Sequence, residues 1–204
     1  MVLKIVQAGE PVLRQKARDL TPEEIGSPEF QRLVALMRDT MRDAPGVGLA
    51  APQVGVGLRL VVIEDRAEYQ AAVPPADLAA RERAPVPFQV LVNPRLTVED
   101  ATPAEFHEGC LSVTGFTALV ARARGVKVEA LDEQGQPVTV HATGWYARIL
   151  QHELDHLDGT LYLDRMETRS FATLENHRRH WAGRSTAEVR EALGLPSTAK
   201  REGR

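Results

Sequence analysis

The sequence predicts an α+β fold in which mostly antiparallel strands surround one central helix. Two observations carry this prediction. The predicted elements follow the order helix, strands, helix, tail, and the last two strands are joined by a short turn, which favours antiparallel pairing. The length of 204 residues and a hydrophobic content of 43% suit one domain with a single core.

The N-terminal segment predicts two helices. A short helical pattern runs from Glu10 through Ala17. A longer helix is predicted to start with Ser27 as N-cap and Pro28 as its first residue, and to end at Pro45-Gly46. Its buried face is predicted from helical spacing of Phe30, Leu33, Val34, Met37 and Met41.

Two strands are predicted next, at Leu58–Glu64 and Gln89–Asn93. The stretch between them, 66–87, is rich in alanine, proline and charge. It is interpreted as a surface insertion with one short helix around Asp77–Arg83.

Three further strands are predicted at Thr117–Val120, Val126–Leu131 and Val138–His141. The last two would form a hairpin, because Gly135 lies within the polar segment 132–136 that joins them.

The central helix is predicted to begin at Thr143 or Gly144 and to stop at Gly159. Its buried stripe would be Trp145, Ile149, Leu150, Leu154 and Leu157. The division expected is a main domain over 1–170 and a basic extension over 171–204. That extension would be partly flexible, with a short helix at Thr186–Leu193 and frayed final eight residues.

Composition excludes several classes of protein. The net charge of −3 provides no basic field, so DNA is not an expected partner. No apolar stretch reaches 18 residues, and the N-terminal residues resemble neither a signal peptide nor a transit segment. With one cysteine there is no internal disulfide. A cytoplasmic location, away from membranes, is therefore expected.

The central helix carries the strongest chemical motif, His152-Glu153-Leu154-Asp155-His156. Histidines four residues apart share a helix face, so both imidazoles can bind one metal ion. Glu153 is offset from that face and could act as a general base. A surface helix with two solvated histidines fits poorly, because leucines bracket the motif.

The third metal ligand is left open by this helix. Cys110 is one candidate, although a lone cysteine is more commonly a small buried hydrophobe. A zinc metallopeptidase of the His-Glu-x-x-His type would instead use a downstream residue, here Glu167, Glu175, His177 or His180.

A third segment, Gly46 to Gln53, combines small uncharged residues in a way that suits backbone lying against a ligand. A plain connecting loop is the alternative. Together with Glu108 to Ser112 and Gln151 to Gly159, it resembles the three motifs of the peptide deformylase family in their order. The context at 144–149 and at Gly115-Phe116 resembles the mitochondrial and plant-organellar branch, although a bacterial source is expected.

The resemblance implies a hydrolase that removes the N-formyl group from formyl-methionyl peptides. It implies that Cys110, His152 and His156 bind Fe²⁺, which Ni²⁺, Co²⁺ or Zn²⁺ could replace. It further implies that Glu153 is the general base, and that the Gln53 amide and the Leu111 backbone N–H stabilise the oxyanion. Gly48 would lie against the substrate backbone.

By position, the methionine side chain would contact Val47, Trp145 and Ile149, with Arg148 at the rim, although core packing explains Trp145 and Ile149 equally well. A Glu108–Arg122 pair is expected beside the metal. Asp155 could assist it or could simply be solvated. Surface positions are expected for His107 and His141. The basic tail could dock on the ribosome.

Overall fold

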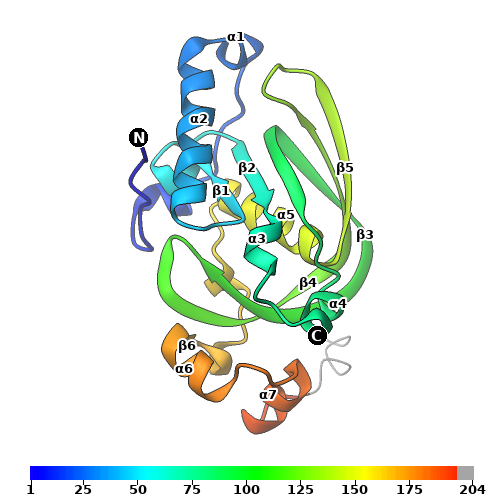
Figure 1. Cartoon of the computed structure of the whole chain (residues 1–204). Helices are drawn as coiled ribbons and strands as arrows, with labels where there is room; N and C mark the ends of the chain where they lie inside the picture. The colour runs from blue at the N-terminus through cyan, green and yellow to red at the C-terminus, as the bar shows by residue number, and fades with distance from the viewer. Residues whose placement is uncertain (197–204) are drawn as a thin grey trace.

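The computed structural model describes residues 1–196 and confirms the α+β class. Five antiparallel strands follow one another across the main sheet (Figure 1). These are β1 (Gly48–Ala50), β2 (Leu60–Asp65), β3 (Val86–Cys110), β4 (Val113–Leu131) and β5 (Pro137–Thr143). A two-residue strand, β6 (Ala172–Thr173), pairs with β4. The final eight residues, predicted to fray, lie outside the described part of the chain.

β3 and β4 are much longer than predicted. The predicted strand Gln89–Asn93 is one part of the 25-residue β3, and the two separate strands predicted within 117–131 belong to the single 19-residue β4. The β3–β4 pairing shifts register at several places, one of them between Val92 and Arg95, where Asn93 has a φ of 51°. Such irregularities bend a strand strongly. The long ribbon consequently curves around the helices instead of ending at Pro94.

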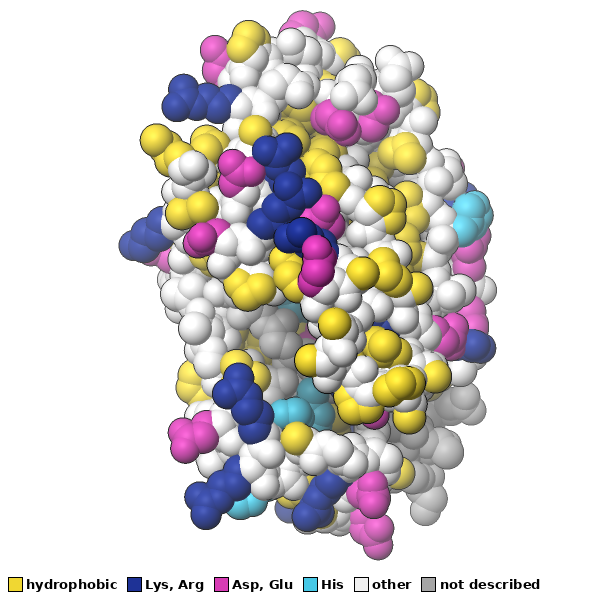
Figure 2. Space-filling view, in the orientation of Figure 1, with side chains coloured by type: hydrophobic (Ala, Val, Ile, Leu, Met, Phe, Trp, Pro, Cys, Tyr) yellow, Lys and Arg dark blue, Asp and Glu magenta, His cyan; other side chains and the backbone are white. Residues whose placement is uncertain are grey.

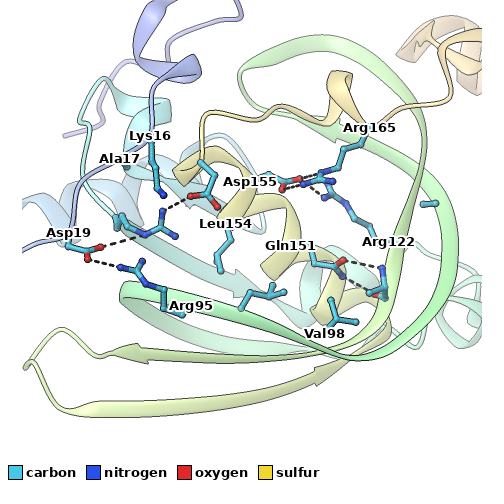
Figure 3. A pocket seen from close by; sticks show the side chains of 15 residues that line it. Lys16, Ala17, Asp19, Arg95, Val98, Arg122, Gln151, Leu154, Asp155 and Arg165 are labelled. Carbon is cyan, nitrogen blue, oxygen red and sulfur yellow. Dashed lines mark hydrogen bonds and ion pairs between the residues drawn. The ribbon is translucent and has the colours of Figure 1, made fainter. Parts of the chain in front are cut away.

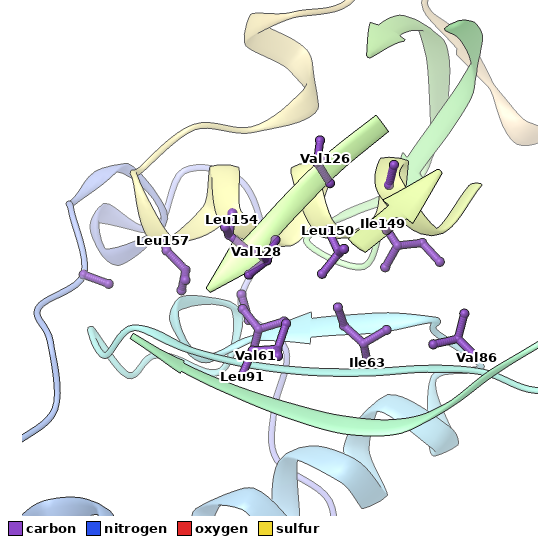
Figure 4. Close-up of a cluster of buried hydrophobic side chains, with 14 residues drawn as sticks. Val61, Ile63, Val86, Leu91, Val126, Val128, Ile149, Leu150, Leu154 and Leu157 are labelled. Carbon is purple, nitrogen blue, oxygen red and sulfur yellow. The ribbon is translucent and has the colours of Figure 1, made fainter. Parts of the chain in front are cut away.

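The central helix α5 (Gly144–Leu157) starts and stops as predicted, with Thr143 as N-cap and Gly159 at φ 72°. Its apolar side packs on the sheet in a cluster that includes Val61 and Ile63 (Figure 4). Strands β1 to β5 all contact α5, so strands surround this helix as expected.

The opposite face of the sheet is covered by helix α2 (Pro28–Asp43). Ser27 caps it by accepting a hydrogen bond from the Phe30 N–H at 3.1 Å. Leu60 and Val62 alternate with the two β2 residues that face α5, and they pack in the cluster of α2. Alternation with a period of two therefore lets β2 contribute to both cores.

The shorter elements differ more from the predictions. The helical pattern expected through Ala17 is one 3₁₀ turn, η1 (Pro11–Arg14), because the Ala17 N–H donates to the Leu157 carbonyl instead. The insertion contains α3 (Ala67–Gln70) and α4 (Pro75–Ala80), so its predicted helix starts two residues earlier and ends sooner. The remaining N-terminal elements are α1 (Pro22–Ile25) and η2 (Ala51–Val54).

The C-terminal segment folds against the long ribbon (Figure 1). It contains η3 (Tyr162–Asp164), η4 (Thr168–Ser170), α6 (Leu174–His180) and α7 (Thr186–Ala192). Helix α7 matches its prediction to within one residue, whereas α6 was not predicted.

The molecular surface carries charges of both signs. Basic and acidic side chains are interspersed over the face in Figure 2, in line with the small net charge. Within residues 1–196, no helix has the length and apolar character needed to cross a membrane.

Candidate functional site

Cys110, His152 and His156 form a compact group of potential metal ligands. Cys110 ends β3, and the two histidines lie one turn apart on α5. One ligand atom from each residue lies within 4.8 Å of the others, and the Cys110 Sγ is 3.3 Å from the His156 Nε2. Among the described residues this is the one such group, and it includes none of the downstream candidates for the third ligand.

The surroundings of these residues fit a metal cation. The His152 Nδ1 lies 3.0 Å from the Glu108 Oε2, an acceptor, so its Nε2 is left available for an ion. Burial opposes a charge on His152, but hydrogen bonds with Cys110 and Glu108 raise its pKa well above the usual value. The site therefore favours a positive charge at this point.

Glu108 is the centre of a buried ion-pair network. Arg122 donates to both carboxylate oxygens at 3.0 Å, and Arg148 donates to Oε1. Burial would raise the pKa of Glu108, but hydrogen bonds from His152 and Arg122 reverse this and hold the pKa below the usual range. The carboxylate is thus ionised and orients His152.

The structure confirms the expected contacts of Glu108 and Asp155 and changes the expectation for Arg148. Glu108 pairs with Arg122, and Asp155 joins them by accepting from Arg122 and Arg165 instead of being simply solvated. Arg148 lines the cavity, as a rim residue would, but it is only 3% exposed and is held by Glu108.

Glu153 lies buried beside Gly48. A Cβ added to Gly48 would be 2.4 Å from the Glu153 Oε1, so any larger residue here would force the Glu153 side chain to move. The other carboxylate oxygen, Oε2, has no hydrogen-bond partner among residues 1–196. Burial raises the pKa of Glu153 to about 7. A carboxyl with that pKa can both accept and return a proton near neutral pH.

Gln53 is held with its amide nitrogen towards Cys110. It lies in η2, is 1% exposed, and accepts the Ala50 N–H at 2.8 Å through Oε1. Its Nε2 lies 3.5 Å from the Cys110 Sγ and 3.4 Å from the Ser112 Oγ. Ser112 was not singled out from the sequence as a contact of Gln53, although it closes the Glu108 to Ser112 motif.

A cavity of about 380 Å³ brings most of the predicted site residues together, whereas the buried His156 does not line it. Those that line it are Val47, Gly48, Gln53, Cys110, Leu111, Trp145, Ile149, His152 and Glu153. Ile149 and Trp145 also pack with the α5 core, so each serves both the cavity and the core. Phe116 and Leu174 line the cavity as well. The Leu174 contact was missed because it depends on how α6 folds back.

His107 is not a surface residue as expected. It lines the same cavity, and its ring centroid lies 4.3 Å from that of His177. Burial, together with the charges of His177 and Arg81, lowers its pKa to about 4. His141 is exposed, as expected, and lies 3.0 Å from Glu99.

Known proteins resemble this chain closely. The family model described as polypeptide deformylase matches residues 2–172. A chloroplastic peptide deformylase 1A from Solanum lycopersicum is 50% identical over 84% of this chain, which spans 62% of that relative's length. Peptide deformylase 1 from Streptomyces coelicolor is 50% identical over 97% of this chain and 89% of its own.

A solved structure shows the same fold. It is a class I type b peptide deformylase from Acinetobacter baumannii with Met-Ala-Ser bound, 33% identical, with a TM-score of 0.72. The alignment covers 81% of this chain and 99% of that one. The motif order, the ligand group and these likenesses agree, and we conclude that this chain belongs to the peptide deformylase family.

Proposed function

We propose that this protein hydrolyses the N-formyl group of formyl-methionyl peptides and releases formate. The observation that carries the proposal is the group of Cys110, His152 and His156 beside one cavity of about 380 Å³, which Cys110, His152, Glu153 and Gln53 line. The zinc metallopeptidase alternative is not favoured, because Cys110 lies where its downstream third ligand would be needed.

Cys110, His152 and His156 would hold one divalent ion, for which we propose Fe²⁺, with Ni²⁺, Co²⁺ or Zn²⁺ able to replace it. When bound, such an ion activates water and polarises a carbonyl group. A thiolate beside two neutral imidazoles is a softer ligand set than three histidines, which suits iron, nickel, cobalt or zinc better than magnesium or calcium.

The protein's own groups would move the protons and receive the charge. Glu153 accepts a proton from water and then gives it to the methionine nitrogen as the amide bond breaks. Gln53 Nε2 and the Leu111 backbone N–H donate to the formyl oxygen as charge develops on it. Removing one such donor typically lowers kcat by roughly 10²–10³-fold.

The cavity walls would set the substrate. Val47, Trp145 and Ile149 offer apolar surface for the methionine side chain, while Gly48 leaves the space beside Glu153 open for the small formyl group. The Acinetobacter baumannii relative with Met-Ala-Ser bound supports a methionyl peptide as ligand.

Formate release from formyl-Met-Ala by iron- or nickel-loaded protein tests the proposal. Glu153→Ala is expected to keep its metal and to lose activity by at least about 10²-fold, whereas the exposed Glu99→Ala should match the unchanged protein. Metal-loaded protein that releases no formate, or that cleaves the Met-Ala bond instead, would contradict the proposal.

We further propose that the protein works in the cytoplasm and meets its substrate at the ribosome through its basic tail. Arg178, Arg179 and Arg184 are exposed on this segment. Reversing the charge of Arg178 and Arg179 should reduce co-sedimentation with ribosomes without lowering activity on formyl-Met-Ala. Unchanged co-sedimentation would show that the tail does not bind the protein to the ribosome.

A further inference from the structure

A second cavity, of about 850 Å³, lies on the other side of α5 from the metal centre. Gln151, Leu154 and Asp155 line it (Figure 3). His152 and Glu153, from the same helix, line the cavity beside the metal group instead. Segments far apart in the sequence complete its wall, including Lys16 and Arg165. None of these cavity residues takes part in the chemical steps proposed above, although Asp155 belongs to the ion-pair network that holds Glu108.

One end of this cavity has more positive charge than its carboxylates can balance. Lys16, Arg59 and Arg95 line it together with two carboxylates, Asp19 and Asp158. The Lys16 side chain forms no ion pair or hydrogen bond with any described residue, and Arg95 shares Asp19 with Arg59. This excess stands out in a chain whose net charge is −3.

Arg59 makes the charge at this end permanent and fixed in place. Its side chain is 6% exposed and is held by Asp158 at 2.7 Å and by the Pro94 carbonyl at 3.1 Å. Its Nε has no hydrogen-bond partner within residues 1–196, and the Asp19 Oδ1 lies 3.7 Å from it. A buried guanidinium compensated this incompletely creates a positive potential that favours an anion.

At the opposite end of the cavity the positive charges are paired with carboxylates. Asp155 accepts from both Arg122 and Arg165, and Arg122 also pairs with Glu108. Three aliphatic side chains also line the cavity. They are Leu154 of α5 and Leu96 and Val98 of β3, and Val98 is 47% exposed. A cationic end beside an aliphatic wall is the arrangement that binds an amphipathic organic anion.

We propose that this cavity is a second ligand site, for a small carboxylate with an aliphatic chain of a few carbons. The carboxylate would lie at Lys16, Arg59 and Arg95, and the chain would lie along Leu154, Leu96 and Val98. The residues that would bind the carboxylate are separate from those of the proposed deformylase reaction, because α5 lies between the two cavities.

Hexanoate is a suitable probe, with hexanol as the neutral control of the same length. Zinc-loaded, ¹⁵N-labelled protein would be titrated with each up to about 10 mM while backbone amide shifts are recorded. Hexanoate should give saturable shifts at Ala17, Leu96 and Ala123, and hexanol should bind at least about tenfold more weakly.

Lys16→Glu should weaken hexanoate binding by about tenfold or more, because an attraction becomes a repulsion. Lys4→Glu, at an exposed lysine away from the cavity, is the matched control and should bind as the unchanged protein does. Both variants should keep formate release, and their spectra without ligand show whether they are folded.

Several outcomes would overturn the proposal. Shifts confined to Gly46–Gly48 and Cys110–Val113 would mean that the carboxylate binds at the metal centre. Equal affinity for hexanol and hexanoate would show that the site does not recognise the negative charge. Unchanged binding by Lys16→Glu, or no saturable shift with hexanoate, would equally contradict it.

Discussion

At the scale of single residues, Gly48 and Glu153 are in such close contact that the position of the Glu153 carboxylate depends on the absence of a side chain at Gly48. A Cβ on Gly48 would overlap the Glu153 carboxylate, with its nearest atom at 2.4 Å. Gly48→Ala should therefore displace the proposed general base and lower kcat for formyl-Met-Ala by about 10²-fold, as misplacement of a reacting group by about 1 Å does.

Gly57→Ala is the matched control, because a Cβ there meets no atom within 4 Å. It should leave kcat and metal content unchanged. If Gly48→Ala kept full activity, Glu153 would have to work from a displaced position, which would argue against it as the positioned base.

His107 makes stability depend on pH. Its pKa is about 4 in the folded protein, against an ordinary value of 6.5, because burial disfavours the charged ring. Between these values this ring binds more protons in the unfolded chain than in the folded one. The contribution of His107 to stability is therefore constant above pH 6.5 and is lost as the pH decreases towards 4. The loss attributable to this partly exposed ring should be about 1–2 kcal/mol.

Urea unfolding of the unchanged protein and of His107→Gln at several pH values measures this contribution. The free energy of unfolding should fall less steeply with decreasing pH in the variant. His141→Gln, at the exposed histidine beside Glu99, should retain the original slope. Identical slopes for His107→Gln and the unchanged protein would refute the prediction.

At the scale of elements, the surface insertion and the central helix meet at Gly144. This glycine begins α5 at φ +58°, and a Cβ on it would lie 2.4 Å from the Glu82 Cβ and 2.8 Å from the Arg81 carbonyl oxygen. Gly144→Ala should cost about 1–2 kcal/mol for the left-handed backbone and about 1–3 kcal/mol more for the overlap.

Gly183→Ala separates these two contributions. It has a φ of +79°, and nothing lies within 4 Å of an added Cβ, so it should show the backbone cost alone. Urea unfolding gives both values. An equal loss in the two variants would mean that the insertion does not press on the start of α5.

At the scale of the whole molecule, the C-terminal helix is attached by a buried ion pair. Arg190 of α7 donates to both oxygens of Glu105 on β3, at 2.7 and 2.8 Å, and both residues are at most 9% exposed. Arg190→Met would leave Glu105 buried without its partner, a change that costs about 3–5 kcal/mol. Hydrogen exchange of the α7 amides should accelerate by about 100-fold or more.

Arg179→Met, at an exposed arginine of α6, is the control and should leave α7 protected. Formate release should survive Arg190→Met, because the ion pair lies away from the cavity beside the metal group. Unaltered exchange in Arg190→Met would show that α7 is held by its apolar contacts, chiefly Val189.

The sequence by itself indicated the chemistry proposed for this protein. Helical spacing places His152 and His156 on one face, and local periodicity and capping residues predict α2, α5 and α7. These features depend on neighbours in the chain, so they can be read without a fold. The family motifs then indicated Cys110, Gln53 and Gly48 before any distance was known.

Only the tertiary structure decided which distant residues meet. The bend of β3 and β4 arises at irregular positions such as Asn93, where alternation is lost, so the short predicted strands were parts of longer ones. The bend brings Glu108 into contact with Arg148, and the folding back of α6 places Leu174 at the cavity. Such contacts carry no local periodicity, because a curved sheet, and not spacing along the chain, brings their partners together.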